Sequence, residues 1–265
     1  MIKFFRKIRQ RLLTENKFSK YLLYAIGEII LVVIGILIAL QINNWNQNRL
    51  NDIEEQRILI AISEELKLSK FLFNEGSTIQ ENKIQAAKNL LQEMQVPNEK
   101  LDNERLDEFI DILTRRWISG TPTSVYDALI GSGDLKLISS EELRNDLALL
   151  KFDQEFLRLF EEIQIKFEDD QLSPFLNKYI NRGAFRLKGK NANSRISDIP
   201  LMPYKPSYSL LLDNMEFSNL LVELIEHSSR VISNYERLER GVHRLDSLVK
   251  SGYSGIENRS IMDTN

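Results

Sequence analysis

The longest apolar run of the chain lies near its N-terminus. Tyr21–Ile42 is a stretch of 22 residues with one charged side chain, that of Glu28. As an α-helix it is about 33 Å long, enough to cross a hydrocarbon core of about 30 Å. It is longer and more apolar than we expect of a buried soluble helix or the core of a cleaved signal peptide, and no small-residue cleavage site follows it. The pattern therefore predicts a transmembrane helix over residues 21–42.

After residue 43 the apolar positions recur with helical spacing. Ten of the sixteen residues from Ile58 to Phe73 are apolar, which predicts a helix covered on more than one side, and Gly76 predicts its end. Thr121 with Pro122 resembles an N-cap followed by proline, and Ser139 with Glu142 resembles a capping box. Further helices are therefore expected over residues 79–94, 103–118, 122–131 and 139–171.

Two helix faces carry regular apolar patterns. The helix from residue 139 has an aromatic-rich stripe, which we interpret as core packing; its members are Phe152, Phe156, Leu159, Phe160, Ile163 and Phe167. Ten positions from Phe217 to Val249 step by four and three residues, and nine suit a heptad seam, Ser228 being the exception. The seam predicts helix packing, with a partner in this chain or in another.

These patterns predict an all-α protein, an N-terminal transmembrane helix followed by an extracytoplasmic bundle of long helices. Sparse glycine (11) and proline (6) suit long helices better than many short strands. The expected parts are a basic amphipathic cytoplasmic stub, the transmembrane helix, a helical periplasmic domain with a basic and proline-rich loop, and a flexible tail. They cover residues 1–20, 21–42, 43–250 (the loop being 182–206) and 251–265.

The charge distribution orients the predicted span. Residues 1–20 hold seven Lys or Arg side chains and one acid, whereas the 20 residues after the span hold only Arg49 and Arg57 as basic groups. The positive-inside rule therefore predicts a cytoplasmic N-terminus and a periplasmic body at a bacterial inner membrane. The first twelve residues can form an interfacial helix with one apolar face, or a disordered basic flank. A basic tip on an acidic body favours contact with membrane lipids and argues against nucleic acid.

Three residues of the predicted span are candidates for a role within the membrane. Glu28 is an intramembrane carboxylate, which can serve as a functional group or can reach the inner headgroup region near Lys20. Gly35 and Ala39 form a small-xxx-small pair that would let two such helices approach closely. The pair favours a homodimer.

The loop over residues 182–206 is basic at first and then has prolines at every third position, Pro200, Pro203 and Pro206. This spacing matches a polyproline II helix, which could bind an aromatic groove. The basic half could bind anionic envelope polymers. A solvated spacer is the alternative.

Groups for catalysis or metal binding are scarce in the sequence. There is no cysteine, and the two histidines, His227 and His243, are sixteen residues apart on one predicted helix. Gly131–Asp134 is glycine-rich like a phosphate loop but lacks the following Lys-Ser/Thr, so a tight turn explains it better. We therefore expect no enzymatic activity, no catalytic residue, no metal and no cofactor.

The first 46 residues, from Met1 to Asn46, resemble the start of a group of single-pass membrane proteins of Bacteroidota that is classed only as a domain of unknown function. Residues 125–138 (VYDALIGSGDLKLI) are similar to a pattern that recurs in that group. The resemblance implies an inner-membrane protein with a helical periplasmic region, and it brings no activity. It marks five residues for attention, with turn and capping roles as the simpler explanation: Tyr126, Asp127, Ser132, Gly133 and Asp134.

The sequence leaves three classes of function. The first is a non-enzymatic helical module that binds a partner or supports an assembly, as a homodimer or with another envelope protein. The second is a sensor-like domain that signals through a cytoplasmic partner, since about 20 residues are too few for an output domain. The third is an enzyme acting on lipid or cell-wall polymer, which would need a deep pocket with converging acids.

Overall fold

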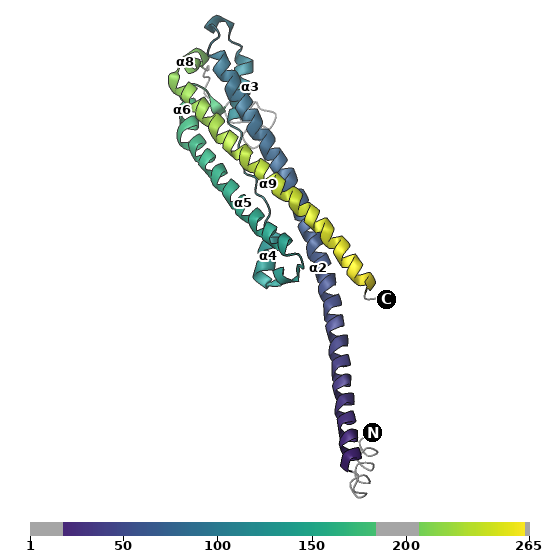
Figure 1. Ribbon diagram of the computed structural model, residues 1–265. Coiled ribbons are helices and arrows are strands. Elements are labelled where there is room, and N and C mark those ends of the chain that lie inside the picture. Colours follow the sequence, from purple (N-terminus) through teal and green to yellow (C-terminus); the bar gives the residue numbers. More distant parts are fainter. Residues whose placement is uncertain (1–17, 184–206, 263–265) are drawn as a thin grey trace.

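The computed structural model describes residues 18–183 and 207–262, and these are helical with no strand among them. The predicted all-α class is confirmed. The helices form an elongated bundle from which one apolar helix projects at the N-terminal end (Figure 1). The predicted stub (residues 1–20) and basic loop (residues 182–206) lie largely outside the described residues.

The first helix, α2, runs unbroken from Phe18 to Glu93, which is about 114 Å at the usual helical rise. It contains the predicted span and is the one helix in the described part of the chain that is long and apolar enough to cross a membrane. No part of its most apolar window is buried against the rest of the chain. The predicted break at Gly76 is wrong, because the helix continues through it.

A short connection and a second helix follow at the end of the bundle far from the N-terminus. A 3₁₀ turn (η1, Asn98–Lys100) leads to α3 (Asn103–Leu113), whose N-cap Asp102 accepts from the backbone N–H groups of Glu104 and Arg105 at 3.1 and 3.3 Å. The predicted helix to Ile118 therefore ends five residues early.

The chain then returns through α4 (Ser124–Ser132) and η2 (Asp134–Leu137) to α5 (Glu141–Phe167). A π-turn (η3, Glu168–Leu172) and α6 (Ser173–Leu176) extend α5, and after the undescribed segment α8 (Tyr208–Leu212) leads into α9 (Met215–Met262). The last helix continues beyond Ser251, where the sequence predicts a tail, and Gly252 there lies against the side chain of Leu59.

The heptad seam of α9 packs within the chain. All ten of its positions, Ser228 included, are buried. They face α2, which has a seam of its own with steps of four and three residues. Its eleven members are all buried: Glu55, Leu59, Ile62, Leu66, Ser69, Phe73, Gly76, Gln80, Lys83, Ala87 and Leu90. The α4 and η2 segments also contact α2, so the predicted cover on more than one side holds, but Ile60, Leu68 and Phe71 are 49–58% exposed and one face stays open.

Two apolar cores fill the bundle. The anchor-proximal core joins Leu59 and Phe73 of α2 to the first half of α5 and the C-terminal half of α9. The anchor-distal core joins Leu90 of α2 to α3, α6, α8 and the start of α9. Polar residues occupy the bundle between them.

The inner face of α5 is not the predicted one. Leu143, Leu147, Leu150 and Leu157 are buried, together with the polar Gln154, Glu161 and Gln164. Of the aromatic-rich stripe only Phe167 is fully buried and Phe160 partly so. The interpretation of the stripe as core packing is therefore wrong, because polar side chains with partners across the bundle occupy the inward positions.

Candidate functional site

A polar layer lies between the two cores, where α2, α5 and α9 meet. Its six residues are at most 3% exposed: Gln80, Lys83, Glu161, Gln164, Glu168 and Ser228. Polar groups in such a position are costly unless they are paired.

The centre of the polar layer is a buried ion pair between Lys83 of α2 and Glu168 at the end of α5. The Gln164 amide nitrogen lies 2.9 Å from the Gln80 amide oxygen, 3.0 Å from the Glu168 carboxylate and 3.3 Å from the Ser228 hydroxyl. Burial lowers the pKa of Lys83, and the adjacent Glu168 carboxylate opposes this shift. Ser228 thus departs from the apolar seam of α9 because it meets this layer.

Glu161 connects the layer to the segment after α3. Its carboxylate accepts from the Tyr235 hydroxyl at 2.6 Å, and from the Ser119 backbone N–H and hydroxyl, each at 3.2 Å. Burial raises the pKa of Glu161, which those donors oppose, and burial with the nearby carboxylate raises the pKa of Tyr235. With these donors on its oxygens, Glu161 holds the backbone in place.

Two glutamates of α2 hold the chain between α3 and α5 (residues 114–140), which we call the return segment. Glu65 accepts from the Ser124 hydroxyl at 2.8 Å and the Val125 N–H at 2.9 Å, at the start of α4. This explains why α4 begins at Ser124 instead of Pro122. Glu55 accepts from both the N–H and the hydroxyl of Ser139 at 2.7 Å, which leaves Ser140 as the N-cap of α5.

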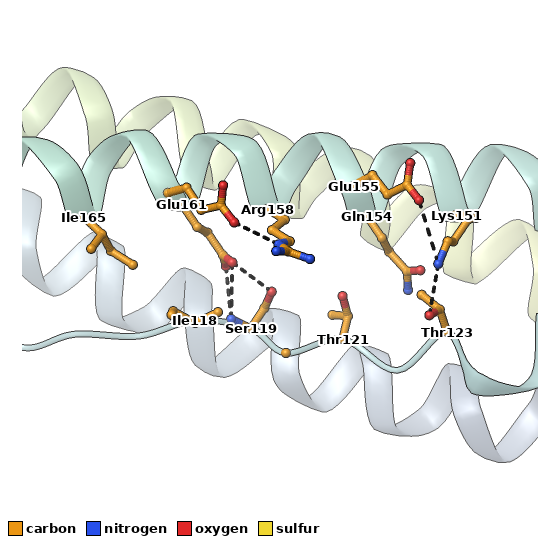
Figure 2. A pocket seen from close by; sticks show the side chains of 12 residues that line it. Ile118, Ser119, Thr121, Thr123, Lys151, Gln154, Glu155, Arg158, Glu161 and Ile165 are labelled. Carbon is orange, nitrogen blue, oxygen red and sulfur yellow. Dashed lines mark hydrogen bonds and ion pairs between the residues drawn. The ribbon is translucent and has the colours of Figure 1, made fainter. Parts of the chain in front are cut away.

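A groove of ≈ 540 Å³ lies between α5 and the segment before α4 (Figure 2). Lys151 and Arg158 line it, and each is ion-paired within the chain: Lys151 with Asp127 at 3.1 Å, and Arg158 with Glu162 at 2.9 Å. Figure 2 shows Glu161 pointing to Ser119 at one end of the groove. The groove has charged walls, and its cations already have carboxylate partners.

The residues marked by the recurring sequence pattern take turn and capping positions. Gly133 ends α4 with a left-handed φ of 77°, and the Asp134 N–H donates to the Ser132 hydroxyl at 3.3 Å. Asp127 accepts from the Thr123 hydroxyl at 2.6 Å; this bond and Lys151 lower the pKa of Asp127. Tyr126 packs, partly buried, against the anchor-proximal core. These side chains fix the shape of the return segment.

The intramembrane candidates lie apart from this region. Glu28, Gly35 and Ala39 are on the projecting part of α2, and no atom outside the helix lies within 4 Å of the position that a Cβ on Gly35 would take. Over the ranges 18–183 and 207–262, no three His, Asp or Glu side chains are arranged to hold a metal ion.

An exposed apolar face on α5 was not predicted as a site. Five residues, spaced by three and four, form what we call the outer seam: Leu149, Phe152, Phe156, Leu159 and Ile163, exposed by 37–57%. The Phe156 ring lies 6.2 Å from that of Phe152 and 5.0 Å, edge to face, from that of Phe160. The heptad spacing could have revealed this seam; its outward direction could not be read from the sequence.

Comparisons with known proteins add one finding. The model of a family described as a family of unknown function (DUF6090) matches residues 28–198, more than half of the chain. The match runs from the apolar part of α2 through α6 and includes the return segment with its recurring pattern. No curated protein and no solved structure matches the chain.

Proposed function

Because the chain belongs to the DUF6090 family, whose function is unknown, we propose its role from its own geometry. The protein is a membrane-anchored, non-enzymatic module of the bacterial envelope, and its helical bundle binds a protein partner through the outer seam of α5. The N-terminus lies in the cytoplasm and the bundle lies in the periplasm.

The observation that carries this proposal is the inverted polarity of α5. Large apolar side chains such as Phe152 and Leu159 are 56% and 49% exposed, whereas Glu161 and Gln164 are 2% exposed. A contiguous apolar stripe on the surface of a soluble domain is typical of a protein interface. The paired cations of the groove and the occupied carboxylate of Glu161 give substrate chemistry less support.

Placement in the envelope is supported by the apolar part of α2 and its flanking charges. The segment is long enough to span a bilayer and is not covered by the chain. Seven basic residues precede it and few follow, which favours a cytoplasmic N-terminus.

A photo-reactive amino acid in place of Phe152, introduced in the native cell, tests the proposal. We expect ultraviolet light to give a covalent product of one defined mass from membranes. The same amino acid in place of Arg158, on another face of α5, is the matched control and should give none. Products that are absent at both sites, or equally abundant at both, would contradict binding through the outer seam.

A sensor is the second candidate, favoured by the continuity of α2. One helix passes without a break from the apolar segment into the buried Lys83–Glu168 layer, so a shift at either end can be transmitted to the other. Such signalling needs a cytoplasmic partner that binds the residues before the apolar segment. A chain that lacks residues 2–16 should then fail to complement a gene deletion; full complementation at normal protein levels would contradict this role.

A further inference from the structure

We propose that the partner of the outer seam is a second copy of this chain in the same membrane, bound with its α5 parallel to the first across a two-fold axis. This rests on the proposed function and names the partner.

The spacing of the outer seam indicates a helical partner. Its five members step by three and four residues from Leu149 to Ile163, which is the a and d pattern of a two-stranded coiled coil. The inner face of α5, centred on Leu150 and Leu157, is already buried by its own bundle. The outer seam is therefore a second packing face for a further helix.

The predicted anchor favours a parallel pair. Two copies held in one membrane by α2 stand the same way up, so a two-fold axis normal to the membrane brings α5 of each copy together in the same direction. Residues at the same seam position then face each other.

The charges beside the seam are complementary under that symmetry. One edge has Glu155 and Glu162, which are 67% and 58% exposed and pair with Lys151 at 3.8 Å and Arg158 at 2.9 Å on their own helix. The other edge has arginines of α9. Arg237 is bonded to Asp153; Arg230, which pairs with Glu226 at 3.2 Å, precedes Arg237 by one heptad and so lies level with Phe160. In a parallel pair Glu155 faces Phe160 and hence Arg230 of the second copy. An acidic edge thus meets a basic edge twice.

The apolar area of the outer seam is that of a weak interface, which confinement to one membrane favours. A large aromatic side chain covers about 150–250 Å² when buried, so the two phenylalanines and three smaller aliphatic side chains, each about half exposed, offer at most roughly 400–500 Å² per copy. That is about half of the ~800 Å² that each partner gives to a standard interface, before the charged edges are added. Confinement to one membrane reduces the entropy lost on association.

The absence of cysteine from the sequence allows a direct test. In the full chain with Phe152→Cys, mild oxidation of native membranes should form a disulfide-linked homodimer. Arg158→Cys is the control, since its side chain is 76% exposed on another face, and it should stay monomeric. Leu159→Cys is a second seam variant, so that the test does not depend on one substitution.

A charge swap adds a result that random collision cannot give. Glu155→Arg should reduce the Phe152→Cys dimer several-fold, and Arg230→Glu added to it should restore the yield. No dimer from either seam variant, or equal dimer from Arg158→Cys, would overturn the pairing.

The two proposals can fail separately. If photo-reactive Phe152 variants give a product with a different protein while the cysteine variants give no dimer, the seam still binds a partner and the second copy is wrong. If neither reagent gives a product, both proposals fall.

Discussion

At the residue level, Gly76 does not end a helix but makes room for side chains that pack closely against α2. A Cβ at this position would lie 2.3 Å from the Tyr235 hydroxyl oxygen and 2.8 Å from the Trp117 indole nitrogen. Gly76 therefore lets Tyr235 reach across α2 and donate to Glu161.

Gly76→Ala should consequently destabilise the bundle by about 1–3 kcal/mol, the usual cost of overpacking. Gly131→Ala is the control, because nothing lies within 4 Å of its Cβ position in α4, and it should be neutral or stabilising. Thermal unfolding followed by circular dichroism in detergent measures both. Equal stability of the two variants would contradict the close approach.

The buried ion pair gives a second residue-level prediction. Lys83→Met leaves Glu168 without its cation in the interior and should cost about 3–5 kcal/mol. The double variant Lys83→Met, Glu168→Leu removes both charges and should recover most of that loss. Denaturant unfolding of the single and double variants is the measurement. A double variant as unstable as the single one would mean that the pair itself holds the fold together.

His227 gives the bundle a dependence on pH. Burial beside Phe167, with ring centroids 4.9 Å apart, lowers the pKa of His227 below that of an unfolded histidine. The folded state therefore binds fewer protons than the unfolded state, and stability falls as the pH drops through the unfolded value of about 6.5.

The melting temperature of the wild type should thus decline between about pH 7.5 and 5.5 more than that of His227→Gln. Parallel curves for the two proteins over this range would exclude His227 as the source. His243→Gln, at a position where the side chain is 57% exposed, is the matched control.

At the level of the elements, the two faces of α5 can be separated with one residue type. Leu157 is 1% exposed and Leu159 is 49% exposed, two positions apart on the same helix. Leu157→Ala should cost about 2–5 kcal/mol of unfolding free energy, whereas Leu159→Ala should change it by less than about 1 kcal/mol. The reverse order in a thermal unfolding assay would place the wrong face inside.

The buried face of a helix can be predicted from the sequence only where that face is apolar. The seam of α9 can be recognised from the sequence because nine of its ten positions suit a heptad seam and only Ser228 departs from it. The seam of α2 does not show in the sequence because it includes Glu55, Gln80 and Lys83, whose partners come from segments far along the chain. Hydrophobic periodicity carries no information on those pairings. For the same reason it predicts the apolar stripe of α5 to be buried, whereas the structure buries the face with Glu161 and Gln164.

The same limit applies to the candidate site. Spacing alone identifies the outer seam residues as a helix-packing face, and the structure decides that they point outward. The turn role of Gly133 was predictable from local sequence, with its φ of 77°. The hydrogen bonds of Glu65 to the start of α4 could not be predicted in this way, because they join residues some 60 positions apart.

At the level of the whole molecule, one helix joins the apolar segment to the bundle (Figure 1). The outer seam gives this bundle an apolar outer face. We propose that this face lies outside the cytoplasm and is covered by a protein partner. The location of this face and its cover by a partner together determine how quickly a thiol on the outer seam reacts in the native membrane.

Labelling of spheroplasts with a membrane-impermeant maleimide tests this most directly, with single cysteines at Phe152 and, as the exposed reference on the same helix, at Arg158. We expect rapid labelling of Arg158→Cys without permeabilisation, and labelling of Phe152→Cys that is several-fold slower until detergent separates the complex. Equal rates at the two positions, or no labelling of either until the membrane is opened, would contradict this proposal.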